Sequence, residues 1–202
     1  MAIFLKENEV GFDARKIGFP GLGSCMAIVL QTPHGLFGFH SFGNNNSKGT
    51  TFGTFASGHA RYGPLLHLYG SAVFAKRYAG SGKFLQWLAE MKFVVGQLNY
   101  RGTVSGFDIG HPGSGVPLAA NKSAYLLYKR DTTTGAVSLR YASSDDVTYN
   151  RANDPATTVR VIRPDQTVAV PHNNSVVQTV TKNAGTNLSA VGDDGFYSIV
   201  LP

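Results

Sequence analysis

Residues that could carry out nucleophilic chemistry cluster near the start of the chain. Cys25 is the single cysteine of the protein, and it follows a glycine-rich turn and precedes the apolar run 26–30, which predicts a buried strand. A second strand-like run, 36–42, delivers His40 fifteen positions after the cysteine. A neighbouring imidazole favours the thiolate, the form of cysteine that attacks a carbonyl carbon, and it can return the proton to a leaving group. The spacing therefore indicates a candidate nucleophile and base carried by one hairpin.

The two side chains can cooperate only if the hairpin places them on one face. Because side chains alternate along strands, Cys25 and His40 share a face only when the numbers of paired residues add up to an odd number. A flush three-residue loop at 33–35 pairs residue 32 with 36 and fails this condition. We therefore expect a loop of even length or a bulge. His34, in the loop itself, is the alternative base, although its neighbours Pro33 and Gly35 favour an exposed turn residue.

The turn Leu22-Gly23-Ser24-Cys25, followed by a strand and then a strand that ends in a histidine, resembles the Cys-His glutamine deamidases. These are the cytotoxic necrotizing factors, the Burkholderia lethal factor family and the bacterial chemotaxis receptor deamidases. The resemblance covers roughly residues 18–43. The chemotaxis enzymes carry a catalytic threonine shortly before the cysteine, whereas residues 16–23 here include no hydroxyl side chain. The chain thus resembles the necrotizing factors, in which a backbone carbonyl is the third catalytic member.

The resemblance implies a thiol mechanism acting on a protein that exposes a glutamine, such as a small GTPase or its regulator. Cys25 would attack the side-chain amide, Gly23 and Ser24 would shape an oxyanion site of backbone N–H groups, and His40 would protonate the departing ammonia. Hydrolysis of the thioester would leave glutamate. The same acyl-enzyme could serve transglutamination or peptide cleavage. The second class of hypothesis is a non-enzymatic β-rich binding or structural domain in which Cys25 is a core residue, as buried cysteines often are.

We expect the group that orients His40 to be a backbone carbonyl or a neutral side chain. Glu7, Glu9 and Asp13 are the only acids before Glu90, and all three fall in a segment that the pattern predicts to be exposed. A carbonyl fixes the tautomer of an imidazole without adding a charge that would raise its pKa. His40 is accordingly expected to keep an ordinary pKa, with an activity limb near pH ~6 to 7.

Composition limits the remaining possibilities. With 202 residues, of which 43% are hydrophobic, the chain can form one domain, taken as residues 1–202. A single cysteine excludes an internal disulfide framework, and no apolar run reaches the ~18 residues of a membrane span. The amino terminus has no basic region ahead of a long apolar segment, so we expect no cleavable signal peptide. Together with the resemblance, this predicts a secreted effector or toxin that acts in the cytosol of a target cell.

Charge and histidine spacing bear on partners and cofactors. Of the net charge of +6, most belongs to residues 1–100, which hold nine Lys or Arg against four Asp or Glu; this excess favours an acidic partner or a solvated basic surface. No dense Lys/Arg run with interleaved aromatics occurs, which argues against nucleic acid as a partner. His59 and His67 have no adjacent cysteine or carboxylate, so neither a metal nor another cofactor is expected.

The pattern of apolar residues predicts an α+β fold, namely a β-sandwich of mixed sheets with two flanking helices. The expected helices cover residues 64–79 and a segment capped by Ser81, whose apolar stripe is Phe84, Leu88, Met91, Val95 and Leu98. Loops or breaks are expected at 7–15, 18–21, 42–50 and 102–117, and the loop 42–50 is a candidate substrate-recognition rim. Strands are expected at 2–6, 125–129, 136–141, 158–163, 167–170, 175–181 and 196–201.

Overall fold

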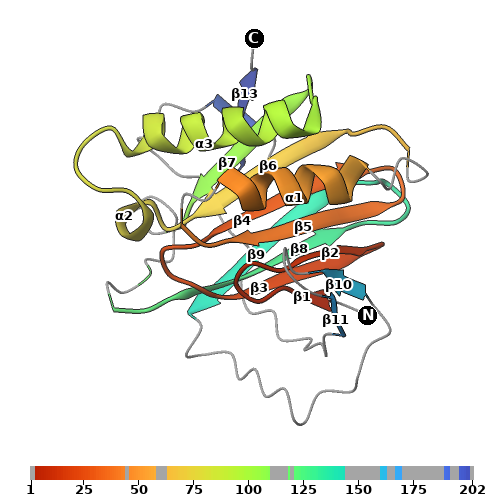
Figure 1. Cartoon of the computed structure of the whole chain (residues 1–202), viewed down its shortest axis with the longest axis horizontal. Coiled ribbons are helices and arrows are strands. Elements are labelled where there is room, and N and C mark those ends of the chain that lie inside the picture. Colours follow the sequence, from red (N-terminus) through yellow and green to blue (C-terminus); the bar gives the residue numbers. More distant parts are fainter. Residues whose placement is uncertain are drawn as a thin grey trace.

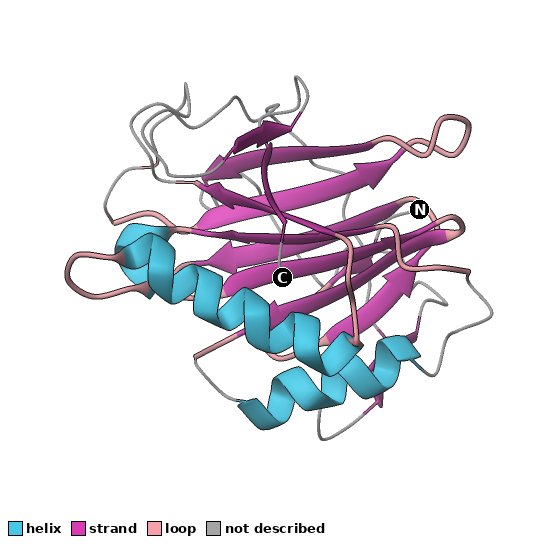
Figure 2. Ribbon diagram, turned by 90° about the horizontal axis from the view of Figure 1, so that it is seen from above, coloured by secondary structure: helices cyan, strands magenta, loops and turns pink. Residues whose placement is uncertain are grey.

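Two β-sheets packed face to face form the core of the protein. The computed structural model describes residues 3–43, 46–57, 63–109, 118, 121–143, 160–162, 167–169, 189–191 and 196–200. Within these ranges, the helices α1 and α3 lie together on the outer side of the larger sheet (Figure 1 and Figure 2). Both sheets contain parallel and antiparallel pairs. The expected α+β sandwich of mixed sheets with flanking helices is therefore confirmed.

The smaller sheet has the strand order β1-β3-β8-β9 among the described residues. Its strands are β1 (Ile3–Phe4), β3 (Lys16–Leu22), β8 (Ala124–Arg130) and β9 (Val137–Ser143). β8 and β9 form the hairpin expected from the sequence, and the Asp131 carboxylate accepts the N–H groups of Thr133 and Thr134 at 2.8 Å in its turn. These bonds give the turn its fixed shape.

The larger sheet has the order β11-β10-β2-β5-β4-β6-β7-β13-β12 in the described part of the chain. Its strands in chain order are β2 (Val10–Asp13), β4 (Met26–Thr32), β5 (Gly35–Ser41), β6 (His67–Ala72), β7 (Thr103–Asp108), β10 (Arg160–Ile162), β11 (Thr167–Ala169), β12 (Ser189–Val191) and β13 (Phe196–Val200). β4 and β5 lie near its middle.

Tyr128 of β8 connects the two sheets inside the sandwich. Its ring lies 6.0 Å from that of Phe19 and 5.7 Å from that of Tyr69, and its hydroxyl is 2.5 Å from Ser71 Oγ. Tyr69 and Ser71 both belong to β6 in the opposite sheet. The inner face of β6 is thus polar but hydrogen-bonded, as a buried polar group must be.

Three helices complete the described fold: α1 (Asn46–Ser57), α2 (Phe74–Arg77) and α3 (Lys83–Leu98). Phe52 of α1 stacks on Phe39 of β5 with ring centroids 5.6 Å apart, and Trp87 of α3 donates its indole N–H to the carbonyl of Gly70 in β6 at 3.1 Å. With the smaller sheet on one side and helices on the other, every residue of β4 is buried. This explains the uninterrupted apolar run after Cys25.

The expected helix at 64–79 is wrong, because this segment forms strand β6 and the four-residue helix α2. β6 pairs with both β4 and β7, so tertiary hydrogen bonding overrides a helical spacing of apolar residues. Gly70 fits the strand for a packing reason. A Cβ at Gly70 would collide with the sulfur of Met91 and lie 3.2 Å from the indole nitrogen of Trp87, so glycine lets α3 pack closely on the strand.

Several expected loops also contain strand or helix. β2 lies within 7–15, β3 runs through 18–21, β7 lies within 102–117, and α1 begins at Asn46 inside the expected loop 42–50. In β3, a register irregularity between Phe19 and Leu22 accommodates Pro20, which cannot donate a ladder hydrogen bond. Residues 110–117, the strand expected at 175–181, and His59 lie outside the described residues.

Helix α3 confirms the second expected helix but not its cap or its full apolar stripe. Its N-cap is Gly82, in the left-handed conformation with φ 75°, rather than Ser81. Its buried side chains are Trp87, Met91, Val94 and Leu98, whereas Phe84, Leu88 and Val95 of the expected stripe are only partly buried. Gly70 and Gly106 of the sheet make room for the Trp87 ring.

Candidate active site

The β4–β5 hairpin has a two-residue loop, and this satisfies the parity condition. Thr32 pairs with Gly35 and Ala27 pairs with His40, so paired numbers add up to 67, an odd number. His40 thus lies directly opposite Ala27, and Cys25 directly precedes β4, two residues before Ala27, so that continued alternation would give it the face of His40. Diagonal partners in a regular ladder are separated by roughly 7 to 8 Å between Cα atoms, and Cys25 lies one residue beyond the last pair of this ladder, Met26 with Ser41. No bulge is needed.

His40 is held as a neutral imidazole with a defined tautomer. Its side chain is 1% exposed, and Nδ1 lies 2.7 Å from the carbonyl oxygen of Leu5. A carbonyl can only accept a hydrogen bond, so Nδ1 carries the proton and Nε2 carries the lone pair. Among the described residues, Nε2 has no hydrogen-bond partner. The expectation that a backbone carbonyl contacts this ring is confirmed, and the buried Nε2 is available as a proton acceptor.

Burial shifts the acid–base properties of His40. Burial lowers its pKa from 6.5 to about 4, the hydrogen bond to the Leu5 carbonyl opposes this change, and the nearby Arg77 cation adds to it. The expectation of an ordinary pKa is therefore wrong. Placing a charged imidazole between two sheets costs free energy, and this cost outweighs the hydrogen bond from the ring to the Leu5 carbonyl.

Cys25 is also held in its neutral form. Its side chain is 5% exposed, and burial raises the pKa of the thiol from 9.0 to about 11, with the Glu7 carboxylate adding to the increase and the Arg77 cation opposing it. At neutral pH the site consequently contains a thiol and a neutral imidazole rather than an ion pair. Since Nε2 makes no hydrogen bond within the described residues, the thiol proton is not yet shared with His40.

The turn before Cys25 has one amide already engaged. Gly21 adopts φ 72°, a conformation that favours glycine, and the N–H of Gly23 donates to the Gly21 carbonyl at 2.9 Å. The Gly23 amide is therefore occupied within the turn. The amides of Ser24 and Cys25 remain as candidate donors to an oxyanion, and the Ser24 side chain is exposed beside the buried thiol.

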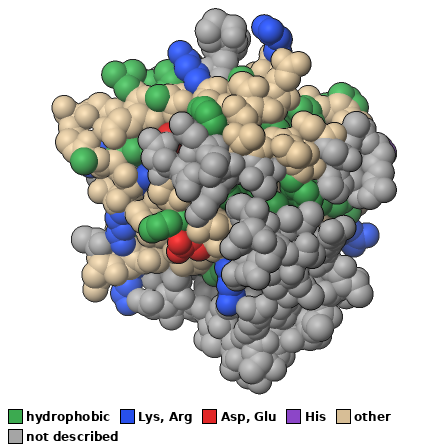
Figure 3. Space-filling model, in the orientation of Figure 1, with side chains coloured by type: hydrophobic (Ala, Val, Ile, Leu, Met, Phe, Trp, Pro, Cys, Tyr) green, Lys and Arg blue, Asp and Glu red, His purple; other side chains and the backbone are tan. Residues whose placement is uncertain are grey.

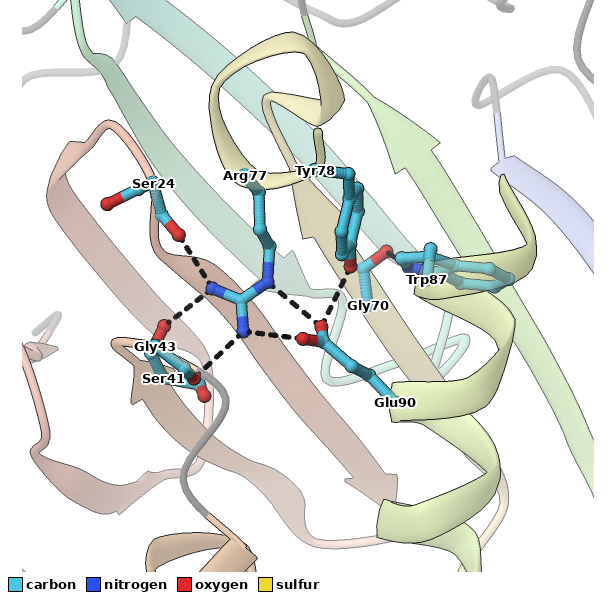
Figure 4. A network of polar contacts seen from close by, with 8 residues as sticks. All are labelled: Ser24, Ser41, Gly43, Gly70, Arg77, Tyr78, Trp87 and Glu90. Carbon is cyan, nitrogen blue, oxygen red and sulfur yellow. Dashed lines mark hydrogen bonds and ion pairs between the residues drawn. The ribbon is translucent and has the colours of Figure 1, made fainter. Parts of the chain in front are cut away.

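Arg77 is a site residue that the sequence reasoning missed. From the end of α2, its guanidinium contacts the carbonyls of Ser24 and Ser41 and the carboxylate of Glu90 on α3 (Figure 4). Ser24 directly precedes the cysteine and Ser41 directly follows the histidine. Arg77 and Glu90 are thirteen positions apart on separate helices, so no motif spacing in the sequence indicates their pairing.

The group that meets the His40 ring is the Leu5 carbonyl rather than one of the acids near the amino terminus, and one of these acids is not exposed as expected. Glu9 is fully buried rather than exposed, and its carboxylate accepts the Lys6 N–H at 2.7 Å. Its backbone carbonyl accepts the His40 N–H at 3.0 Å, which helps fix β5 against the preceding segment. Asp13 accepts the N–H groups of Arg15 and Lys16 in a turn.

The other described histidines are not placed to act on the thiol. His34 is exposed in the loop of the hairpin, at the end opposite Cys25, and is therefore not the base. His67 is bonded through Nε2 to Ser105 Oγ at 2.6 Å. Within the described ranges, no group of three or more His, Cys, Asp or Glu could hold a metal ion.

The surface near the site has one exposed aromatic ring. Phe42 is 44% exposed and follows the β5 strand directly after Ser41. On the face shown in Figure 3, the described Lys and Arg side chains lie scattered rather than gathered in one patch. None of the helices in the described ranges is long and apolar enough to cross a bilayer.

Comparison with known proteins finds no matching protein-family model and no matching curated protein.

Proposed function

We propose that this protein is a thiol-dependent protein glutamine deamidase, with Cys25 as the nucleophile and His40 as the base. The observation that supports the proposal most is the state of the His40 ring. A backbone carbonyl holds Nδ1–H at 2.7 Å, which leaves a buried Nε2 lone pair without a partner among the described residues. An unsatisfied buried acceptor costs about 1 to 3 kcal/mol, and a role as proton acceptor accounts for its retention.

The mechanism follows from two neutral groups. As the sulfur of Cys25 bonds to the amide carbon of a substrate glutamine, the thiol proton passes to His40 Nε2. The amides of Ser24 and Cys25 donate to the developing oxyanion. Nε2 then returns its proton to the leaving nitrogen, ammonia departs, and a thioester remains. A water molecule gives its proton to Nε2 as it attacks, and the C–S bond breaks to leave glutamate and the free thiol.

Burial of the thiol favours a side-chain amide over a main-chain peptide as the substrate. Cys25 is only 5% exposed, whereas attack on a peptide bond requires an open cleft that admits an extended chain. The glutamine side chain is slim and carries its amide at the end of a flexible stem. The substrate is a folded protein with an exposed glutamine, such as a small GTPase or its regulator, and the setting is a secreted effector or toxin acting in a target-cell cytosol.

The proposal is tested with purified protein and a panel of purified small GTPases and their regulators. Glutamine-to-glutamate conversion is mapped by mass spectrometry for the wild type, Cys25→Ser and His40→Asn. The wild type is expected to convert at least one glutamine, and each variant is expected to lose most of the rate, because nucleophile and base act as a unit. Folded Cys25→Ser protein with wild-type conversion would refute the proposal.

A primary amine added to the same reaction separates deamidation from transglutamination. Deamidation predicts that glutamate remains the main product when a small diamine competes with water for the thioester. Incorporation of the diamine in place of glutamate would assign the acyl transfer to an amine acceptor. Cleaved substrate chains would instead indicate a peptidase. If Cys25 is only a core residue, none of these products depends on it.

A further inference from the structure

All five N–H donors of Arg77 make hydrogen bonds within the described structure. This suits a side chain that is only 4% exposed and has little access to water. Nε donates to Glu90 Oε2 at 2.9 Å, and Nη2 donates to Glu90 Oε1 at 3.2 Å and to the Gly43 carbonyl at 3.2 Å. Nη1 donates to the carbonyls of Ser24 at 2.7 Å and Ser41 at 3.3 Å. A planar guanidinium can make this set of bonds, whereas an ammonium group has three donors on a single atom.

The three carbonyls belong to the two chain segments that carry the proposed nucleophile and base. Ser24 is the residue before Cys25, Ser41 is the residue after His40, and Gly43 continues the same segment. Figure 4 shows the guanidinium lying between these carbonyls on one side and Glu90 on the other. The carbonyls of Ser24 and Ser41 both lie at the end of the hairpin where the β4–β5 ladder stops, which is the pair Met26 and Ser41. Beyond that pair, Arg77 replaces the ladder as the connection between the two segments.

A second layer holds the guanidinium in place. Glu90 binds it through both carboxylate oxygens and also accepts the Tyr78 hydroxyl at 2.8 Å. Helix α3, which carries Glu90, is fixed to the larger sheet by the bond from the Trp87 indole to Gly70. Helix α2, which carries Arg77, begins where the Phe74 N–H donates to Asp108 Oδ1 at 3.0 Å. The guanidinium therefore has a fixed position relative to the sheet.

We propose that Arg77 is a positioning residue that holds the Cys25 turn against the end of the His40 strand, so that thiol and imidazole meet in reactive geometry. This inference rests on the proposed function of the Cys25–His40 pair. Arg77 acts in two ways that an experiment can separate. The planar fork connects the carbonyls, and the positive charge acts on the thiol, on which the Glu7 carboxylate acts in the opposite direction.

Three variants separate positioning from charge. Arg77→Lys keeps the charge but cannot bridge the carbonyls, and Arg77→Gln removes both. Arg77→Gln/Glu90→Gln removes both while leaving no unpaired buried carboxylate, which protects folding. Arg101→Lys, at an exposed arginine beyond the opposite end of the sheet, is the matched control for the Arg-to-Lys change. Deamidation kinetics, melting temperature and the pH dependence of Cys25 alkylation by chloroacetamide are measured for each.

For Arg77→Lys we expect kcat to fall about 10²-fold, as a displacement of roughly 1 Å between reacting groups can cause, with KM and the alkylation midpoint unchanged. For the two Gln variants we expect the same loss and a higher alkylation midpoint, because the cation that lowers the thiol pKa is gone. Arg101→Lys is expected to match the wild type.

A lower melting temperature for Arg77→Lys together with wild-type kcat per folded molecule would overturn the inference and assign Arg77 a purely structural role. The proposed function fails in a different way, namely when the wild type itself shows no Cys25-dependent conversion. The two failures are therefore distinguished by the wild-type and Cys25→Ser reactions run beside the arginine variants.

Discussion

Replacing His40 should make the protein less sensitive to acid, because the ring is buried in its neutral form. Burial lowers its pKa from 6.5 to about 4. Between these two pH values the unfolded chain binds a proton at His40 that the folded chain does not bind. The contribution of the neutral His40 ring to the free energy of unfolding is therefore intact above pH ~6.5 and is lost as the pH falls towards ~4.

The structure sets the size of this effect. A pKa difference of roughly 2.5, taken from 6.5 and about 4, corresponds to about 3 kcal/mol at ~1.4 kcal/mol per pKa unit. At pH 5, roughly 2 kcal/mol of this contribution has already been lost. The pKa of His67 is lowered to about 4 by burial as well, but His67 remains in both proteins and cancels in the comparison.

The assay is urea unfolding at pH 8 and pH 5 for the wild type and His40→Asn. Asparagine is chosen because its amide N–H can still donate to the Leu5 carbonyl. At pH 8 the variant should be less stable than the wild type because packing is lost. Its free energy of unfolding should, however, fall between pH 8 and pH 5 by roughly 2 kcal/mol less than that of the wild type. His34→Asn controls for removal of an exposed histidine. Equal losses in wild type and His40→Asn would refute the inference of a buried neutral ring.

Three further predictions follow from the same structure. First, kcat/KM for glutamine conversion should be flat between pH 6 and 8 and fall near pH ~4, where the His40 imidazole becomes protonated; a limb at pH 6 to 7 would contradict this. Second, Glu7→Gln should lower the pKa of the Cys25 thiol and speed its alkylation at pH 9, since the Glu7 carboxylate raises that pKa; an unchanged rate would count against it. Third, Gly106→Ala should lower the free energy of unfolding in urea by about 1 to 3 kcal/mol, because a methyl group would stand 2.8 Å from two atoms of the Trp87 indole. Gly96→Ala has open space around it and should instead stabilise α3 by up to about 1 kcal/mol.

Local patterns predicted the elements in which one signal dominated. The apolar run after Cys25, the strand that carries His40 and the β8–β9 hairpin were all predicted from sequence. The exact loop length was not, because the parity condition allowed an even-length loop or a bulge, and the residue types also suit a three-residue loop at 33–35. The Thr32 hydroxyl decides between them, since it accepts the Gly35 N–H at 3.2 Å and donates to the Gly35 carbonyl at 3.1 Å, which closes the two-residue loop.

Contacts between distant segments were beyond sequence reasoning. The Leu5 carbonyl reaches the His40 ring from thirty-five residues away, and a backbone atom leaves no signature in residue types. The bonds from Arg77 likewise depend on the placement of two helices. The helical spacing at 64–79 was misleading because it also suits an inner strand, and only the pairing of β6 with β4 and β7 decides the outcome.

The most direct test of a working Cys25–His40 pair is the rate at which native protein reacts with chloroacetamide, whose carboxamide matches that of glutamine in size. Intact-mass measurement at pH 7 follows a single adduct on Cys25, with Cys25→Ser as the blank and His40→Asn as the comparison. If His40 Nε2 accepts the thiol proton during attack, the wild type should react at least about tenfold faster than His40→Asn. Equal rates in the two proteins, or a native thiol that stays unlabelled, would contradict the proposed pair.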